Sequence, residues 1–309
     1  MSHAKFAISA FLLGIIIFIP TGIYCDQRVI KEFGKDQKSG KIVFSSYMSG
    51  NWQIWAIDPR KRDVLQLTHI PHEAHYPALS PDGRRLVYAT NEGEIWLMEI
   101  GGNPQKLSNL PKNCTHPSWS PDGSKIAFIR YSFQYGKEDG DICIVELKHA
   151  KVWKLLDQKG VQKYPAWSPD GSNILYTTGY RVSPSKIIEE LWLIKSNGIK
   201  PRILVSNKFS NIQPDWSPNG QRIAFASDQS GNMEIWIVGK DGKNARNLTQ
   251  NKAYDADPSW SPDGSKICFV STRGGKMDIW IMDSDGRNVK QLTGFSDSIA
   301  ESKEPDWSP

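Results

Sequence analysis

Residues 118–123 read S-W-S-P-D-G, and close copies of this motif recur along the chain. The other copies are A-L-S-P-D-G at 78–83, A-W-S-P-D-G at 166–171, D-W-S-P-N-G at 215–220, S-W-S-P-D-G at 259–264 and a shortened D-W-S-P at 306–309. Their prolines lie 40 to 49 residues apart, which is the length of one four-stranded blade of a β-propeller. The spacing therefore predicts an all-β, six-bladed propeller.

Each repeat has the same internal order of turns and strands. Ser-Pro-Asp-Gly suits a type I turn, in which proline fixes the first central residue and glycine takes the left-handed position that follows. An apolar segment comes next, such as K-I-A-F at 125–128, and then a second one, such as D-I-W-I-M at 278–282. A strand that is apolar on both faces fits between neighbouring layers. An outer strand, such as R-N-L-T at 246–249, completes a four-stranded antiparallel blade.

Ten of the 12 tryptophans occupy two positions of the repeat. They are Trp119, Trp167, Trp216, Trp260 and Trp307 before Ser-Pro, and Trp55, Trp96, Trp192, Trp236 and Trp280 on the second apolar segment. Large rings that fill the space between blades explain this regularity, so we predict that they belong to the core. The alternative is a stacking surface for sugars or bases.

The two ends of the repeat region complement each other. K-I-V-F at 41–44, Q-I-W-A-I at 53–57 and L-Q-L-T at 65–68 form three strands with no W-S-P strand before them, whereas the copy at 306–309 has only that strand. Pairing the carboxy-terminal strand beside 41–44 would close the first blade and remove the free edges of the ring. The alternative is a chain truncated after Pro309.

The amino terminus carries the features of an export signal. Residues 6–19 are uncharged and apolar and follow Lys5, but 14 residues are too few to span a bilayer comfortably. We predict a signal peptide, or a membrane anchor, at 1–24, a polar tether at 25–40 and the propeller at 41–309. The mature chain is then periplasmic or secreted, without stable insertion in the membrane. Cys25 is a candidate for a lipid anchor, although Tyr24 departs from the bacterial lipobox pattern.

The composition excludes one class of partner. The chain carries 38 Lys and Arg against 33 Asp and Glu, a formal charge of +5 on 309 residues, which is too small an excess to indicate nucleic-acid binding. No G-x-S-x-G motif is present in the sequence, so a serine hydrolase of the α/β type is excluded as well.

The P-x-W-S-P-D-G, K-I-A-F, E-I-W-I and N-L-T motifs resemble the carboxy-terminal propeller of TolB, the periplasmic protein of the Tol-Pal envelope system. The resemblance covers 41–309 and implies a WD-type, six-bladed exported propeller whose channel mouth binds protein segments or cations. It does not extend to the amino-terminal domain of TolB, because only about 15 residues separate the predicted signal from the first strand. Similar repeats occur in propellers attached to prolyl-oligopeptidase-like hydrolases and in metal-dependent oligouronide lyases.

The residues directly before P-x-W are expected to line one mouth of the channel. In ring order they are Tyr76, His116, Tyr164, Gln213, Asp257 and Glu304. Aromatic rings among polar side chains are typical of protein interfaces. We therefore predict a monomeric, non-enzymatic platform that binds an envelope or extracellular protein at these residues.

Two alternative sites involve metals. His72, His75 and His116 could hold a transition metal, since imidazoles beside a carboxylate are good ligands, and this would favour a metal-dependent glycan lyase or hydrolase. Asp255, Asp257 and Glu304 could instead hold calcium through oxygen atoms. No other cofactor is predicted.

Overall fold

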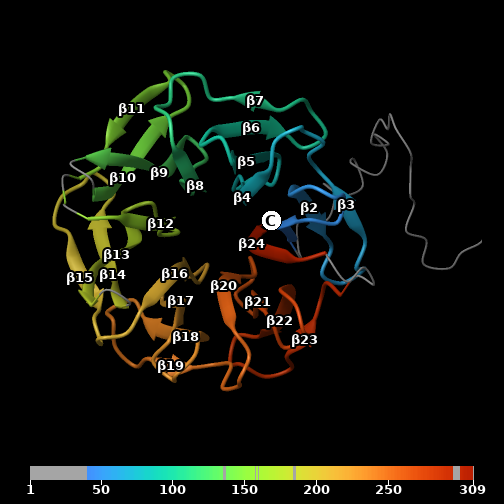
Figure 1. Ribbon diagram of the computed structural model, residues 1–309, viewed down its shortest axis with the longest axis vertical. Helices are drawn as coiled ribbons and strands as arrows, with labels where there is room; N and C mark the ends of the chain where they lie inside the picture. Colours follow the sequence, from blue (N-terminus) through green and yellow to red (C-terminus); the bar gives the residue numbers. More distant parts are fainter. Residues whose placement is uncertain are drawn as a thin grey trace, which may run out of the picture.

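The computed structural model describes residues 40–134, 137–156, 158, 160–183, 186–294 and 300–308. The predicted signal peptide, Cys25 and all of the predicted tether except Gly40 lie outside the described residues. The described part consists of 24 strands in six four-stranded antiparallel sheets, arranged as blades around a central axis (Figure 1). It contains no helix of the length and apolarity needed to cross a membrane.

The blades follow one another along the chain, and each inner strand faces the axis (Figure 1). Blade 1 is β24 (Ser302–Ser308), β1 (Lys41–Ser46), β2 (Gln53–Ile57) and β3 (Val64–Gln66); blade 2 is β4 (Ala74–Leu79), β5 (Arg85–Thr90), β6 (Ile95–Glu99) and β7 (Gln105–Lys106). Blade 3 is β8 (Cys114–Trp119), β9 (Lys125–Gln134), β10 (Lys137–Glu146) and β11 (Lys151–Lys154); blade 4 is β12 (Gln162–Trp167), β13 (Asn173–Ser183), β14 (Lys186–Lys195) and β15 (Arg202–Val205). Blade 5 is β16 (Asn211–Trp216), β17 (Arg222–Ser227), β18 (Glu234–Gly239) and β19 (Arg246–Asn247); blade 6 is β20 (Asp255–Trp260), β21 (Lys266–Ser271), β22 (Asp278–Asp283) and β23 (Lys290–Gln291).

The predicted closure of the first blade is confirmed. β24 pairs with β1 in antiparallel register, with Trp307 opposite Ile42. Trp307 is buried and packs in one cluster with Ile42 and Phe44 of blade 1 and with Cys268 and Val270 of blade 6. The carboxy-terminal strand therefore completes blade 1 and also joins it to blade 6, which leaves no free inner edge in the ring.

The turns follow the chemistry expected of Ser-Pro-Asp-Gly. In blade 3, Ser120 Oγ donates to Asp122 Oδ1 at 2.6 Å and accepts from the Lys125 N–H at 2.9 Å. Gly123 lies in the left-handed region, with φ of 67°, where a glycine has no steric penalty. The same arrangement recurs in the other complete copies of the motif, so local sequence alone fixes each hairpin between an inner strand and its neighbour.

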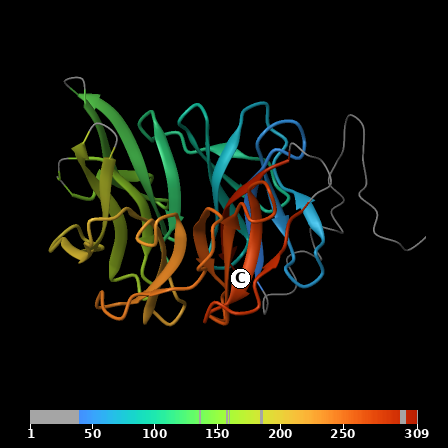
Figure 2. The same ribbon diagram turned by 60° about the horizontal axis from the view of Figure 1, so that its bottom comes forward.

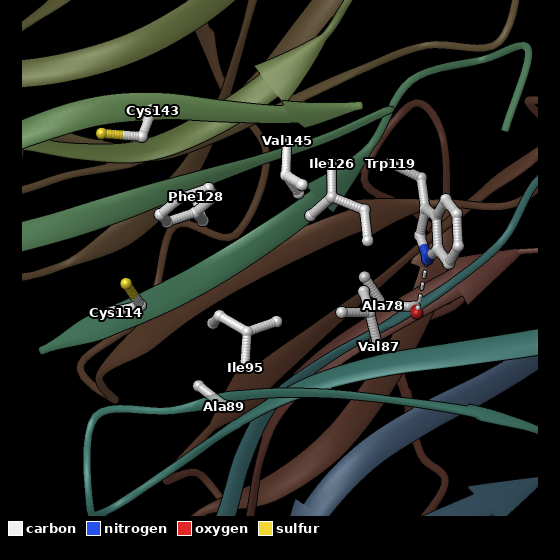
Figure 3. Packing of buried hydrophobic residues seen from close by; sticks show 10 residues of the cluster. All are labelled: Ala78, Val87, Ala89, Ile95, Cys114, Trp119, Ile126, Phe128, Cys143 and Val145. Carbon is white, nitrogen blue, oxygen red and sulfur yellow. Dashed lines mark hydrogen bonds between the residues drawn. The ribbon is translucent and has the colours of Figure 1, made fainter. Parts of the chain in front are cut away.

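Apolar side chains fill the wedges between blades. Figure 3 shows the wedge between blades 2 and 3, where Val87 and Ile95 face Ile126 and Phe128, and the indole N–H of Trp119 reaches the neighbouring blade. Of the ten repeated tryptophans, those at 119, 216, 260 and 307 are buried, while Trp167 and the five on the third strands are half-buried. The described cysteines, at 114, 143 and 268, are buried free thiols, as their apolar surroundings suggest.

Two hairpins depart from the common blade length. β9–β10 and β13–β14 extend beyond their counterparts, and the first of them (green in Figure 2) rises from one face of the ring. Tyr180, Val182 and Ile187 of the second hairpin are exposed.

Candidate functional site in the central channel

The six residues predicted at the channel mouth come together around the axis, and we call them the channel ring: Tyr76, His116, Tyr164, Gln213, Asp257 and Glu304. All six line one cavity of about 500 Å³, together with the prolines that follow them and those of the Ser-Pro-Asp-Gly turns. Each is half-buried.

A β-bulge positions every member of the channel ring. The register between the inner strand and its neighbour shifts at the ring residue and the proline after it in all six blades. Proline supplies no N–H for the ladder, so the pairing is interrupted there. The ring residues have φ between 50° and 58°, although a residue before proline normally prefers an extended conformation. Such backbone strain is found where the surrounding structure fixes the conformation, and it is concentrated at functional sites.

One half of the ring is a chain of hydrogen bonds from blade to blade. Gln213 Oε1 accepts from the Asp257 N–H at 3.2 Å, the Asp257 carboxylate accepts from the Glu304 N–H, and Glu304 Oε2 accepts from the Tyr76 N–H at 2.8 Å. Each side chain thus binds the strained backbone of the next ring residue. This satisfies N–H groups that the bulge removes from the ladder.

The other half of the ring is aromatic. The ring of Tyr76 stacks on His116 with centroids 3.8 Å apart, and His116 meets Tyr164 edge to face at 4.8 Å. Both ring nitrogens of His116 are buried without a hydrogen-bond partner among the described residues. Burial lowers the pKa of His116 to about 4, so its imidazole is neutral at pH 7. Burial, followed by the nearby carboxylates, raises the pKa of both tyrosines, which therefore remain phenols.

A second layer of the channel adds two carboxyl groups. Asp215 Oδ2 accepts from the Trp260 N–H at 2.8 Å, and Asp306 Oδ2 accepts from the Leu79 N–H at 3.0 Å. Burial raises the pKa of Asp215 and of Asp257 to about 7 and that of Asp306 to about 6. None of the described residues lining the cavity is a lysine or arginine. The sequence reasoning missed Asp215 and Asp306, although both stand before Trp-Ser-Pro where other copies have Ala or Ser.

Glu304 bonds to groups from two blades. Its Oε2 accepts from the Ser45 hydroxyl at 2.7 Å and from the Tyr76 N–H, and it lies 3.6 Å from His75 Nδ1. Burial would raise the pKa of Glu304, but the hydrogen bonds and the positive charge of His75 lower it overall. Burial would lower the pKa of His75, but Glu304 and then Glu73 raise it overall. The two groups thus form an ion pair at the edge of the ring.

The three histidines proposed as metal ligands have three different environments. His72 Nδ1 lies 3.1 Å from Glu92 Oε1 near the surface, His75 pairs with Glu304, and His116 lies between tyrosines. In the acidic set, Asp255 is fully buried and pairs with Arg273 at 2.6 Å. Within the described ranges, no group of three or more His, Cys, Asp or Glu side chains is arranged to hold a metal ion. Metal binding at these residues stays a prediction for elemental analysis.

Comparison with known proteins identifies the repeat. The family model of the TolB beta propeller domain matches residues 76–187 and 185–309. The fold is similar to TolB from Acinetobacter baumannii (21% identity, 89% of this chain and 68% of that chain, TM-score 0.74) and to a putative TolB from Agrobacterium tumefaciens (22%, 88% and 99%, 0.69). It is also similar to an oligogalacturonate lyase in complex with manganese (17%, 84% and 75%, 0.59). No curated protein sequence matches the chain.

Proposed function

Because the chain belongs to the TolB beta propeller domain family, we propose that it is an exported, non-enzymatic platform that binds another protein of the periplasm or cell envelope through its central channel. The family supports a periplasmic location, as does the export signal predicted at 1–24. The fold by itself does not specify a function, so the argument rests on the channel.

The observation that carries the proposal is the composition of the channel ring. Tyr76, His116 and Tyr164 form an aromatic half with one stacked and one edge-to-face contact, while Gln213, Asp257 and Glu304 form a polar half. Aromatic side chains offer large contact area at a small loss of rotamer entropy, and interface hot spots combine them with a surround that excludes water. A rigid cavity of about 500 Å³ with this lining favours insertion of a short protein segment.

The bonding of the titratable groups also favours binding over catalysis. A general acid or base must reach the substrate with the proton it transfers. Asp257 and Glu304 instead accept N–H groups of the neighbouring blade, and His116 is neutral and packed between two rings. These groups thus bond the backbone of the channel ring and shape the channel, which favours a binding role.

Capture of a partner from envelope extract by the purified chain, followed by affinity measurement with the isolated partner, tests the proposal. Tyr164→Ala should weaken the complex by about 1 to 3 kcal/mol, or about 5- to 150-fold, as expected for an interface hot spot. Tyr180→Ala is the matched control, because Tyr180 is half-exposed on the β13–β14 hairpin, away from the channel. A partner that binds both variants equally, or that is lost only with Tyr180→Ala, would move the interface away from the channel.

A further inference from the structure

Blade 2 has a glycine at a turn position where blades 1, 5 and 6 carry a large side chain. Blade 3 also has a glycine there, Gly140, but Val161 lies against it: a Cβ added at Gly140 would lie 2.9 Å from Val161 Cγ1. In four blades, the carbonyl of the residue two positions before the first isoleucine of the third strand accepts the first N–H of the next inner strand. The acceptor and donor residues are Trp52 and Ala74, Gly93 and Cys114, Met233 and Asp255, and Met277 and Ser302, at 2.8 to 2.9 Å. Gly93 therefore occupies the position that Trp52, Met233 and Met277 hold in blades 1, 5 and 6.

The large side chains at this position fill the space between blades. Met233 packs against a buried cluster of Ile212, Ala226 and Ala256. Trp52 lies against the rings of Tyr47 and His75, with centroids 5.9 and 5.5 Å apart, and Lys303 Nζ lies 4.0 Å from its centroid. In blades 1 and 5, a side chain of the turn itself thus fills the space between that blade and the next.

The turn of blade 2 has no side chain that can fill the corresponding space. Its turn has three residues, 91–93, between Thr90 and Glu94, whereas the turn of blade 5 has six, 228–233, between Ser227 and Glu234. Gly93 has φ of +73°, and a Cβ added there would lie 2.7 Å from the Cα of Asn113. No side chain of this chain can therefore extend from position 93 in the way that Met233 does.

A cavity of about 360 Å³ lies at this position, and we call it the blade-2 cavity. His75, Ala89 and Thr115 line it, and they are the counterparts in blades 2 and 3 of the three residues that hold Met233. Tyr76 and Tyr131 add two further rings to its lining, and Asn91 and Asn113 are exposed at its border. The lining of the blade-2 cavity thus matches the surroundings of Met233, and the cavity can act as a binding site, or seat, for one large side chain.

We infer that the blade-2 cavity receives one large aromatic side chain from the bound partner. The kind of occupant is indicated by the equivalent positions of blades 1, 5 and 6, which carry Trp52 or a methionine. Three rings favour an aromatic occupant, because offset and edge-to-face contacts add to the burial of apolar area. The amides of Asn91 and Asn113 can bond the backbone of the inserted segment. The inference rests on the proposed function, since Tyr76 and Glu304 line both this cavity and the channel.

The first test uses N-acetyl-L-tryptophanamide as the probe, with N-acetyl-L-alaninamide as its small counterpart. Titration of the deuterated, ¹⁵N-labelled full chain should shift the amide signals of Gly93 and Cys114, with a dissociation constant of about 1 mM for so small a ligand. The alanine compound should cause no shift at the same concentration. Equal shifts with both compounds, or shifts confined to other blades, would overturn the inference.

The second test fills the blade-2 cavity with a methionine of the chain itself. Replacing residues 91–93 by D-Q-S-G-N-M, the sequence of 228–233, gives blade 2 the turn of blade 5 and its methionine. The matched control is the same six-residue turn ending in glycine. The methionine variant should weaken binding of the tryptophan probe at least tenfold, and the glycine variant should retain it. Retention by the methionine variant, or loss in both variants, would contradict a side-chain seat.

Partner capture separates this inference from the proposed function. Tyr164 lines the channel but not the blade-2 cavity, so Tyr164→Ala reports on the channel alone. Weaker capture by both Tyr164→Ala and the methionine variant supports both statements. If Tyr164→Ala weakens capture and the methionine variant does not, the seat is refuted and the channel interface stands. If neither variant weakens capture, the proposed function fails, and the seat fails with it as a site for that partner.

Discussion

We expect Asp257 to make the stability of the protein depend on pH. Burial, and then the charge of Glu304, raises the pKa of Asp257 from 3.8 to about 7, and the Glu304 N–H, Lys303 and Gln213 offset this only in part. The folded state therefore binds this proton more tightly than the unfolded state does. The resulting stabilisation is fully present below pH 3.8 and is lost as the pH rises through about 7. About three pKa units correspond to about 4 kcal/mol.

Asp257→Asn removes the titration while keeping an amide oxygen that can accept from the Glu304 N–H. At pH 8 the variant should be more stable than the wild type by up to about 4 kcal/mol, and at pH 3.5 the two should be nearly equal. Urea unfolding at the two pH values measures the difference. A variant that is less stable than the wild type at pH 8 would show that the channel stabilises a charged Asp257. A difference that is the same at both pH values would show that the pKa of Asp257 is not raised in the folded state.

Asp122→Asn is the matched control for this substitution. The hydroxyl of Ser120, followed by backbone and side-chain bonds of Ser124, lowers the pKa of Asp122 to about 2, the opposite of the shift at Asp257. Blade 5 already has Asn219 at this turn position, and it accepts from Ser217 at 2.8 Å. The control should therefore gain no stability at pH 8.

Three further predictions concern closure, metal binding and export. Trp307→Ala should lower the free energy of unfolding by about 3 to 5 kcal/mol, because this ring joins blades 1 and 6, and a melting temperature close to that of the wild type would contradict closure by β24. If His72, His75 and His116 hold a transition metal, zinc or manganese should co-purify with the protein and raise its melting temperature; absence of both effects would leave them as loop and channel residues. Amino-terminal sequencing of exported protein should begin between residues 21 and 27, and an intact Met1 on soluble cytosolic protein would contradict an export signal.

The architecture could be predicted because each blade repeats the same local chemistry. A Ser-Pro-Asp-Gly turn fixes its hairpin through bonds within five residues, as Ser120 and Lys125 show, so the position of every inner strand follows from the sequence. The bulges could not be predicted in this way. A residue before proline favours an extended backbone, whereas φ is 51° at Tyr76 and 58° at Glu304. These bulges form in the assembled ring, where the bond from the Tyr76 N–H to Glu304 crosses from one blade to the next.

The candidate site could be predicted only as a set of positions. The place before P-x-W identifies Tyr76 and Glu304 as members of one ring, but their mutual hydrogen bond joins residues 228 apart in sequence and depends on the closed ring. The ion pair of Glu304 with His75 has the same origin, and it assigns His75 a partner other than a metal. Nothing in the sequence of a single repeat marks Gly93 as a functional residue. The hydrogen bonds of the folded ring show that Gly93 occupies the position of Met233 in another blade, and only this comparison reveals the missing side chain.

The blade-2 cavity, unlike the channel ring, arises from a difference between blades. The channel ring occupies one equivalent position in all six blades, and only its residue types differ from blade to blade. Gly93 forgoes the packing that Met233 provides, and a cavity lined by buried Ala89 is the result. The blade-2 cavity also shares Tyr76 and Glu304 with the channel, and a partner seated in one cavity must contact the ring that forms the other. If the methionine-filled turn proves more stable than the wild type and captures the partner more weakly, the exchange of stability for binding at Gly93 is demonstrated in one variant.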